Sequence, residues 1–186
     1  MAGFASATPA FAASTPKSVP IDVRVAALAA SLENLAVATY AAGLKAATAG
    51  KLGPVPPAVA TFAVTAMAQH KDHAAVWNST LTSAGYAKVT KPDPVEAKKV
   101  NAAFAKVKNI VGLAQLALLL EGVAAATYLE GLSVVTSTQA KQTAASIHPV
   151  EMQHVAILRF VLGENPVPSA FASMALARPL SDNPYL

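Results

Sequence analysis

Two segments of this chain are near copies of each other: residues 32–44 read LENLAVATYAAGL, and residues 120–132 read LEGVAAATYLEGL. Each copy places one glutamate, Glu33 or Glu121, among alanine, leucine and valine in a pattern typical of an apolar helix. Burying a carboxylate is costly unless it is paired or binds a metal. Because both copies keep the glutamate, 88 residues apart, the repeat predicts one shared site to which both copies contribute.

The composition predicts an all-α protein. The 186 residues are 54% hydrophobic and only 13% charged, and they are rich in alanine and leucine, which favour helices. The longest apolar stretch, 111–120, contains Gln115 and ends at Glu121, so it is shorter than the roughly 20 apolar residues of a membrane helix. We therefore expect a core helix there and no transmembrane segment. The net charge of +4 comes from scattered lysines without an Arg-rich face, which argues against nucleic-acid binding.

Helix start and stop signals divide the chain into four long helices and one short one. Glycine and proline clusters bound the long helices, and the crossover that joins the second to the third is long and basic, with a short helix expected within it. Two hairpins of helices joined by one long crossover form a four-helix bundle. The predicted helices cover about 20–49, 58–83, 95–107, 110–135 and 139–162, within a bundle domain at 20–163.

The two ends of the chain are predicted to lie outside the bundle. Residues 1–19 are small and apolar, and Ala10-Phe11-Ala12 matches the A-x-A pattern of a signal-peptidase site. The first basic residue is Lys17, so the charged start of an export signal is missing. We expect an exported protein, periplasmic or extracellular, with a signal-peptide remnant; a disordered tail on a cytoplasmic protein is the alternative. Residues 164–186 contain four prolines and are expected to form an extended tail.

Histidines at helical spacing accompany both glutamates. The fourth long helix carries Glu151-x-x-His154, and side chains three residues apart share one face of a helix. Glu121 lies 16 residues before the expected turn at Ser137, and Glu151 and His154 lie 14 and 17 residues after it, which at about 1.5 Å per residue puts them at one height. The first hairpin repeats this coincidence with Glu33 and His70-x-x-His73. The spacing therefore predicts a metal site built from six residues: Glu33, His70, His73, Glu121, Glu151 and His154.

Over about residues 20–163 and at these six positions, the chain resembles the ferritin-like superfamily, most closely its bacterial ferritin-like and desiccation-related group. The pattern of that family is a glutamate from each of two helices and a Glu-x-x-His from each of the other two, all binding two metals. The resemblance implies two iron or manganese ions, with zinc or copper as alternatives. His70 departs from the pattern, because the family has a second metal-bridging glutamate there. The resemblance therefore implies that Glu151 remains as the bridge and that His70 offers only a terminal nitrogen.

Four aromatic or imidazole side chains near the candidate ligands need an interpretation. Tyr40 and Tyr128 each follow a ligand glutamate by seven residues, two turns along the same helix face. The resemblance implies that such a tyrosine bonds a ligand or takes part in catalysis, whereas packing in the core is the alternative. Trp77 is expected to pack, and His148 either supports the ligands or is unrelated to them.

These features support three functions. The first is a dimetal oxidoreductase acting on O₂ or peroxide, like a ferroxidase, peroxidase or catalase. The second is a non-catalytic stress or structural protein with a degenerate or single-metal site, which the His70 departure favours. The third is iron storage in a cage, but the Pro-rich tail does not look like the short fifth helix of cage-forming relatives. The expected partners are metal ions and O₂ or peroxide, and a homodimer is left open.

Overall fold

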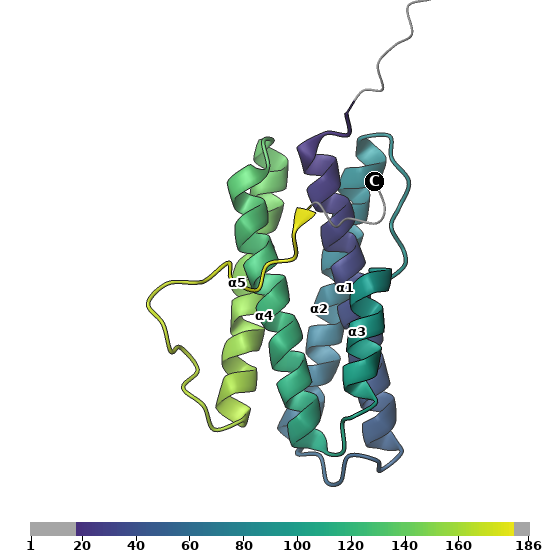
Figure 1. The fold of residues 1–186 in the computed structure, drawn as a ribbon, viewed down its shortest axis with the longest axis vertical. Coiled ribbons are helices and arrows are strands. Elements are labelled where there is room, and N and C mark those ends of the chain that lie inside the picture. The colour runs from purple at the N-terminus through teal and green to yellow at the C-terminus, as the bar shows by residue number, and fades with distance from the viewer. Residues whose placement is uncertain (1–17, 181–186) are drawn as a thin grey trace, which may run out of the picture.

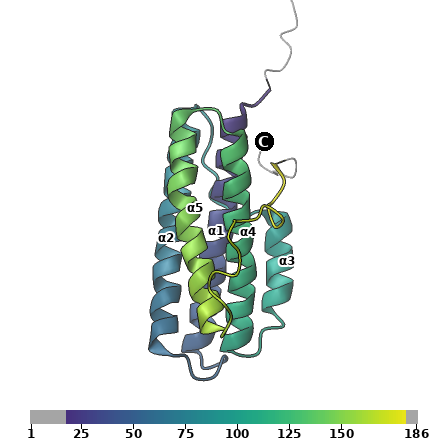
Figure 2. The same cartoon turned by 90° about the vertical axis from the view of Figure 1, so that its left-hand side faces the viewer.

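A computed structural model of the protein describes residues 18–180, and five helices and no strand are present there. The four long helices form a bundle, and the short helix lies outside it beside α4 (Figures 1 and 2). The expected all-α bundle with a long crossover between its second and third long helices is confirmed. The expected export signal around Ala10–Ala12 lies outside the described residues. The helices are α1 (Ile21–Thr48), α2 (Pro57–Ser83), α3 (Pro94–Phe104), α4 (Ile110–Val134) and α5 (Thr138–Val161).

Local signals decide where the helices begin and end. Proline occupies the first turn of α2 and α3, where its missing N–H costs nothing. Asn109 and Ser137 cap α4 and α5, because their side-chain oxygens accept hydrogen bonds from backbone N–H groups in the first turn. Gly85, with φ of 83°, ends α2 in the left-handed region that favours glycine. The ends agree with the predicted ones to within a few residues.

Two asparagines attach the crossover to the first hairpin. The Asn78 side chain donates to the carbonyl of Val89 and accepts from its N–H, at 3.0 and 2.7 Å. Asn34 donates to the same carbonyl at 2.9 Å. Asp93 then begins α3, since its carboxylate accepts two backbone N–H groups of the first turn. The crossover is therefore held along the outside of α1 and α2 before the chain enters α4 (Figure 1).

The two hairpins, α1–α2 and α4–α5, are related by the internal repeat. Gly43 on α1 faces Leu113 on α4, where an added Cβ would lie 3.0 Å from the leucine Cδ2. Gly131 on α4 faces Val25 on α1 in the same way, with 3.4 Å to the valine Cγ1. Each residue of the second pair is displaced by the same 88 residues that separate the two ligand glutamates. Gly43 therefore lets α1 and α4 approach closely on one side of those glutamates, whereas on the other side Gly131 leaves room for a Cβ in van der Waals contact with Val25.

The apolar core fills one half of the bundle. The cluster of buried side chains joins the first turns of α1 and α5 to the last turns of α2 and α4, and includes Trp77, Leu81 and Ile147. These positions lie on the side of the glutamates remote from the α1–α2 turn. The other half, next to that turn, contains more partly buried side chains along α1 and α4.

α1 and α4 are long and apolar enough to cross a membrane by length and composition alone. The sequence predicted no membrane-spanning helix, because the apolar stretch 111–120 ends at Glu121. Averaged over 18 residues, however, a helix can stay apolar enough even when it contains one glutamate. The most apolar window of α1 is 56% buried in the bundle and that of α4 is 22% buried. Both helices belong to the bundle and bury Glu33 and Glu121 inside it.

The chain after α5 returns across the bundle and lies on α4 (Figure 1). Residues 176–180, which we call the C-terminal strap, lie against Gly122 through Leu176. The backbone N–H of Arg178 donates to the hydroxyl of Thr127 at 2.9 Å. The guanidinium of Arg178 lies 3.5 Å from the buried carboxylate of Asp93. The strap therefore ties α4 to the start of α3.

Candidate metal centre

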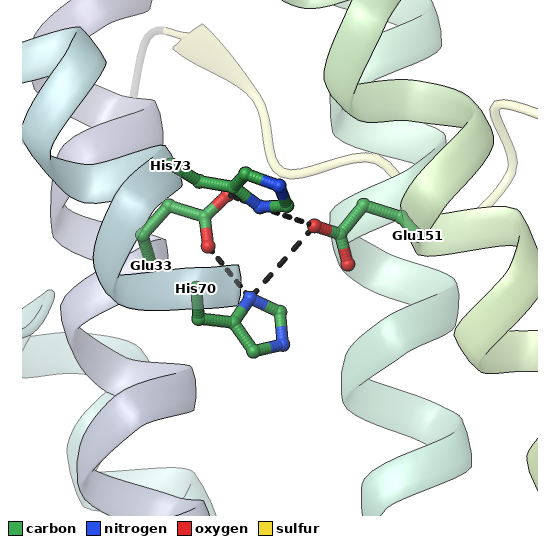
Figure 3. Close-up of side chains that lie close together, drawn as sticks. All are labelled: Glu33, His70, His73 and Glu151. Carbon is green, nitrogen blue, oxygen red and sulfur yellow. Dashed lines mark hydrogen bonds and ion pairs between the residues drawn. The ribbon is translucent and has the colours of Figure 1, made fainter. Parts of the chain in front are cut away.

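The structure brings all six sequence-predicted ligands together near the middle of the bundle. Five of the side chains are at most 4% exposed, and that of His73 is 11% exposed. The ligand atoms form two groups that share two members, and within each group the atoms lie within 4.8 Å of one another. One group, whose four side chains are drawn in Figure 3, is Glu33, His70, His73 and Glu151. The other is His70, Glu121, Glu151 and His154.

Glu151 and His70 are the two residues that belong to both groups. Glu151 Oε1 lies 2.9 Å from His73 Nδ1, and Glu151 Oε2 lies 3.4 Å from His154 Nδ1. The imidazole of His70 spans the two glutamates, with 2.7 Å from Nδ1 to Glu33 Oε2 and 3.2 Å from Nε2 to Glu121 Oε1. One carboxylate and one imidazole thus belong to both groups. The central place of Glu151 agrees with the expectation, whereas His70, from which only a terminal nitrogen was expected, has both ring nitrogens close to glutamates.

The polar atoms of Glu151 fit a metal site. Both of its carboxylate oxygens are buried and lack an aligned hydrogen bond from any described residue, and so does His73 Nδ1 despite its short distance to Glu151. Buried polar atoms without partners are costly, so natural proteins rarely leave them unpaired. Metal ions beside Glu151 would satisfy these atoms. Three carboxylates and three imidazoles suit iron, manganese or zinc, so the residues fit the expected metals.

Protons occupy this cluster in the metal-free protein. Burial raises the pKa of Glu151. Burial also opposes ionisation of Glu33, but the contacts with His70 and His73 outweigh it and lower the pKa of Glu33. Burial opposes protonation of the imidazoles too, but contacts with Glu121 and Glu33 raise the pKa of His70 well above its usual range, and contacts with Glu151 and Glu33 raise that of His73 to about 9. Metal ions would therefore have to displace protons from these rings.

Gln69 orients His154 and was not singled out from the sequence. His154 Nε2 lies 2.8 Å from Gln69 Oε1, to which it donates, and this leaves Nδ1 toward Glu121 and Glu151. Burial lowers the pKa of His154, but the contacts with those two glutamates raise it to about 9. The sequence carries no signal for this role, because a glutamine beside His70 looks the same whether it faces solvent or a neighbouring helix.

The two tyrosines link the hairpins at the ligands. Tyr40 of the first hairpin donates to Glu121 Oε1, and Tyr128 of the second donates to Glu33 Oε1, each at 2.5 Å. Burial and the nearby carboxylates raise the pKa of both phenols, so both keep their protons. Trp77 Nε1 donates in turn to the Tyr128 hydroxyl at 2.8 Å, a bond that the sequence did not reveal. Both tyrosines thus hold candidate ligands in place, while their part in catalysis stays a prediction.

His148 has no contact with the ligands that the structure shows. It is half-buried, and its Nε2 has no hydrogen-bond partner within residues 18–180. Burial lowers its pKa. Of the two interpretations from the sequence, the geometry favours a histidine unrelated to the centre.

Comparison with known proteins agrees with this geometry. A family profile described as Ferritin-like domain matches residues 21–164, which include all five helices and all six candidate ligands. Comparisons with curated proteins and with solved structures found no match. Because the profile covers most of the chain, the chain belongs to the ferritin-like domain family.

Proposed function

We propose that this protein binds two iron or manganese ions in the Glu/His cluster and uses them to react with O₂ or peroxide. The observation that carries the proposal is the position of Glu151, whose unpartnered oxygens lie between His73 and His154. Each ion would have a histidine and a glutamate of its own and would share Glu151. One ion would take Glu33 and His73, and the other Glu121 and His154.

The protein contributes orientation, charge and exclusion of water. Two redox-active ions would supply electrons for the reduction of O₂ or peroxide. Tyr40 and Tyr128 donate to one oxygen of Glu121 and Glu33, respectively, and so fix the orientation of both carboxylates in the cluster. Three carboxylates balance three of the four charges of two divalent ions when the imidazoles are neutral. A single anion at the centre would make it neutral.

A second proposal, a single-metal site without redox turnover, rests on His70. Its ring lies within ion-pair distance of Glu33 and Glu121 at once, which is the arrangement of a protonated imidazole that donates from both nitrogens. One divalent ion and one imidazolium would balance the three carboxylates. The protein would then hold a single zinc ion and serve a stress or structural role.

Metal counting and a peroxide assay separate the two proposals. The full chain would be purified without chelator, loaded anaerobically with Fe(II) or Mn(II), and its metal content measured by plasma mass spectrometry. The redox proposal predicts two ions per chain and peroxide consumption. Glu151→Gln should lose at least one ion and the turnover, whereas Glu164→Gln, which changes an exposed glutamate outside the cluster, should lose neither.

Two results would decide against the redox proposal. Absence of peroxide and O₂ consumption with both metals would reject it. One zinc ion per chain, rising to two in His70→Glu, would support the single-metal proposal, because the substitution supplies the second bridging carboxylate that the family pattern has.

A further inference from the structure

An elongated cavity of about 120 Å³ runs between α1 and α4 and reaches the metal centre. Glu121 and His70 form part of its wall at the centre. From there it extends in both directions, toward Val25 and Gly131 on one side and toward the α1–α2 turn on the other. The part toward the turn lies in the half of the bundle that the buried core cluster leaves less filled. The walls of this lower part include Ala36, Leu44, Phe62, Leu113 and Ala117.

The lower part of the cavity presents apolar walls. Thr39 and Tyr40 line it, but the Thr39 hydroxyl donates to the carbonyl of Leu35 at 2.8 Å and the Tyr40 hydroxyl donates to Glu121. Such walls leave the polar groups of a peptide or a sugar unsatisfied, which is costly, but they suit a hydrocarbon. Ile110 and Glu121 are 11 residues apart on α4, so this part is about 16 Å long at 1.5 Å per residue.

The end of this apolar space at the metal centre is polar and charged. It meets the buried carboxylates and imidazoles of the centre, where two divalent ions would leave one positive charge unbalanced. A molecule that fits both ends has a long alkyl chain and a single negative charge at one terminus.

We propose that the cavity binds a linear fatty acid, with its carboxylate at the metal centre and its alkyl chain between α1 and α4, pointing toward the α1–α2 turn. The inference rests on the proposed metal function for the head group. The position of the alkyl chain is argued from the cavity alone, so the metal function and the alkyl-chain site can fail separately.

Calorimetric titration of the Mn(II)-loaded full chain with dodecanoate, butyrate and dodecanol tests the proposal. Dodecanoate should bind more than about tenfold tighter than butyrate, because each buried methylene adds favourable transfer free energy. Dodecanoate, but not dodecanol, should change the Mn(II) paramagnetic resonance spectrum, since only its head group is an anionic ligand. Equal affinities for dodecanoate and butyrate, or an unchanged spectrum, would overturn the proposal.

Cavity-filling variants locate the bound chain. Ala117→Phe fills the wall one turn from Glu121 and should weaken dodecanoate binding at least about tenfold, because the ring occupies space that the methylenes need. Ala38→Phe makes the same change on an exposed face of α1 and should leave the affinity unchanged. If circular dichroism shows that Ala117→Phe does not fold, Ala36→Phe fills the opposite wall. Unchanged binding in the folded variant contradicts the assignment.

The metal-free protein separates this inference from the proposed function. If Mn(II) does not bind, the metal proposal fails, and dodecanoate binding to the metal-free chain that Ala117→Phe abolishes still supports the cavity as a fatty-acid site. If Mn(II) binds but dodecanoate binds to neither form, the inference fails and the metal proposal stands.

Discussion

Removing the hydroxyl of Tyr128 tests the hydrogen-bond chain behind the metal centre. In Tyr128→Phe, Glu33 loses a donor at 2.5 Å, and the Trp77 N–H loses its acceptor at 2.8 Å. A hydrogen bond to a charged group is worth about 1.5–3 kcal/mol, and a buried unsatisfied donor costs about 1–3 kcal/mol. Trp77 is fully buried, so water cannot replace the lost acceptor. The expected loss in the free energy of unfolding is therefore about 2.5–6 kcal/mol.

Tyr40→Phe is the matched control, because the repeat places Tyr40 at the equivalent position. Its hydroxyl donates to Glu121, and the structure gives it no tryptophan donor like Trp77. The expected loss is only about 1.5–3 kcal/mol. Urea unfolding of both variants in the presence of EDTA, followed by circular dichroism, measures the difference. Equal losses, or a loss below about 1 kcal/mol in Tyr128→Phe, would show that the buried Trp77–Tyr128–Glu33 chain does not stabilise the fold as argued.

Three further predictions concern pH, α4 and the strap. The pKa values of His73 and His154 are about 9 in the folded metal-free protein, above the usual 6.5. The protonated rings therefore stabilise the fold fully below about pH 6.5, and this stabilisation is lost as the pH rises through 9. The melting temperature should fall over that range, and much less in the metal-loaded protein. Gly131→Ala should raise the free energy of unfolding by about 1 kcal/mol in urea, since alanine favours the helix and its Cβ would sit 3.4 Å from Val25; a decrease would contradict the packing described. Arg178→Ala leaves the buried Asp93 carboxylate without its cation, so we expect a loss of about 3 kcal/mol and faster proteolysis of the strap; unchanged cleavage would contradict this role.

The clustering of the six candidate ligands could be predicted because helical geometry determines so much of their position. A helix repeats its face every three or four residues, and an antiparallel hairpin puts residues equidistant from the turn at one height. Those two rules place Glu121 next to Glu151 and His154 without any knowledge of side-chain contacts. The repeat then extends the argument to the first hairpin.

The supporting bonds could not be predicted in the same way. Whether Gln69 faces His154 or water depends on how α2 and α5 lie against each other, which the sequence pattern does not encode. The bond from Trp77 to Tyr128 depends on rotamers of two large side chains in contact. The apolar cavity depends on the distance between α1 and α4, because alanine and leucine line a filled interface as readily as an open one.

The crossed pairs, in which each tyrosine bonds the glutamate of the other hairpin, give the fold the architecture of a dimer of hairpins joined into one chain. In a true homodimer, any substitution would appear at both equivalent positions. Joining the halves removes that constraint, so the position equivalent to Glu151 can hold His70 while Glu151 itself is kept. One continuous chain thus permits an asymmetric set of candidate ligands, in which the two halves of the proposed centre would differ in metal affinity.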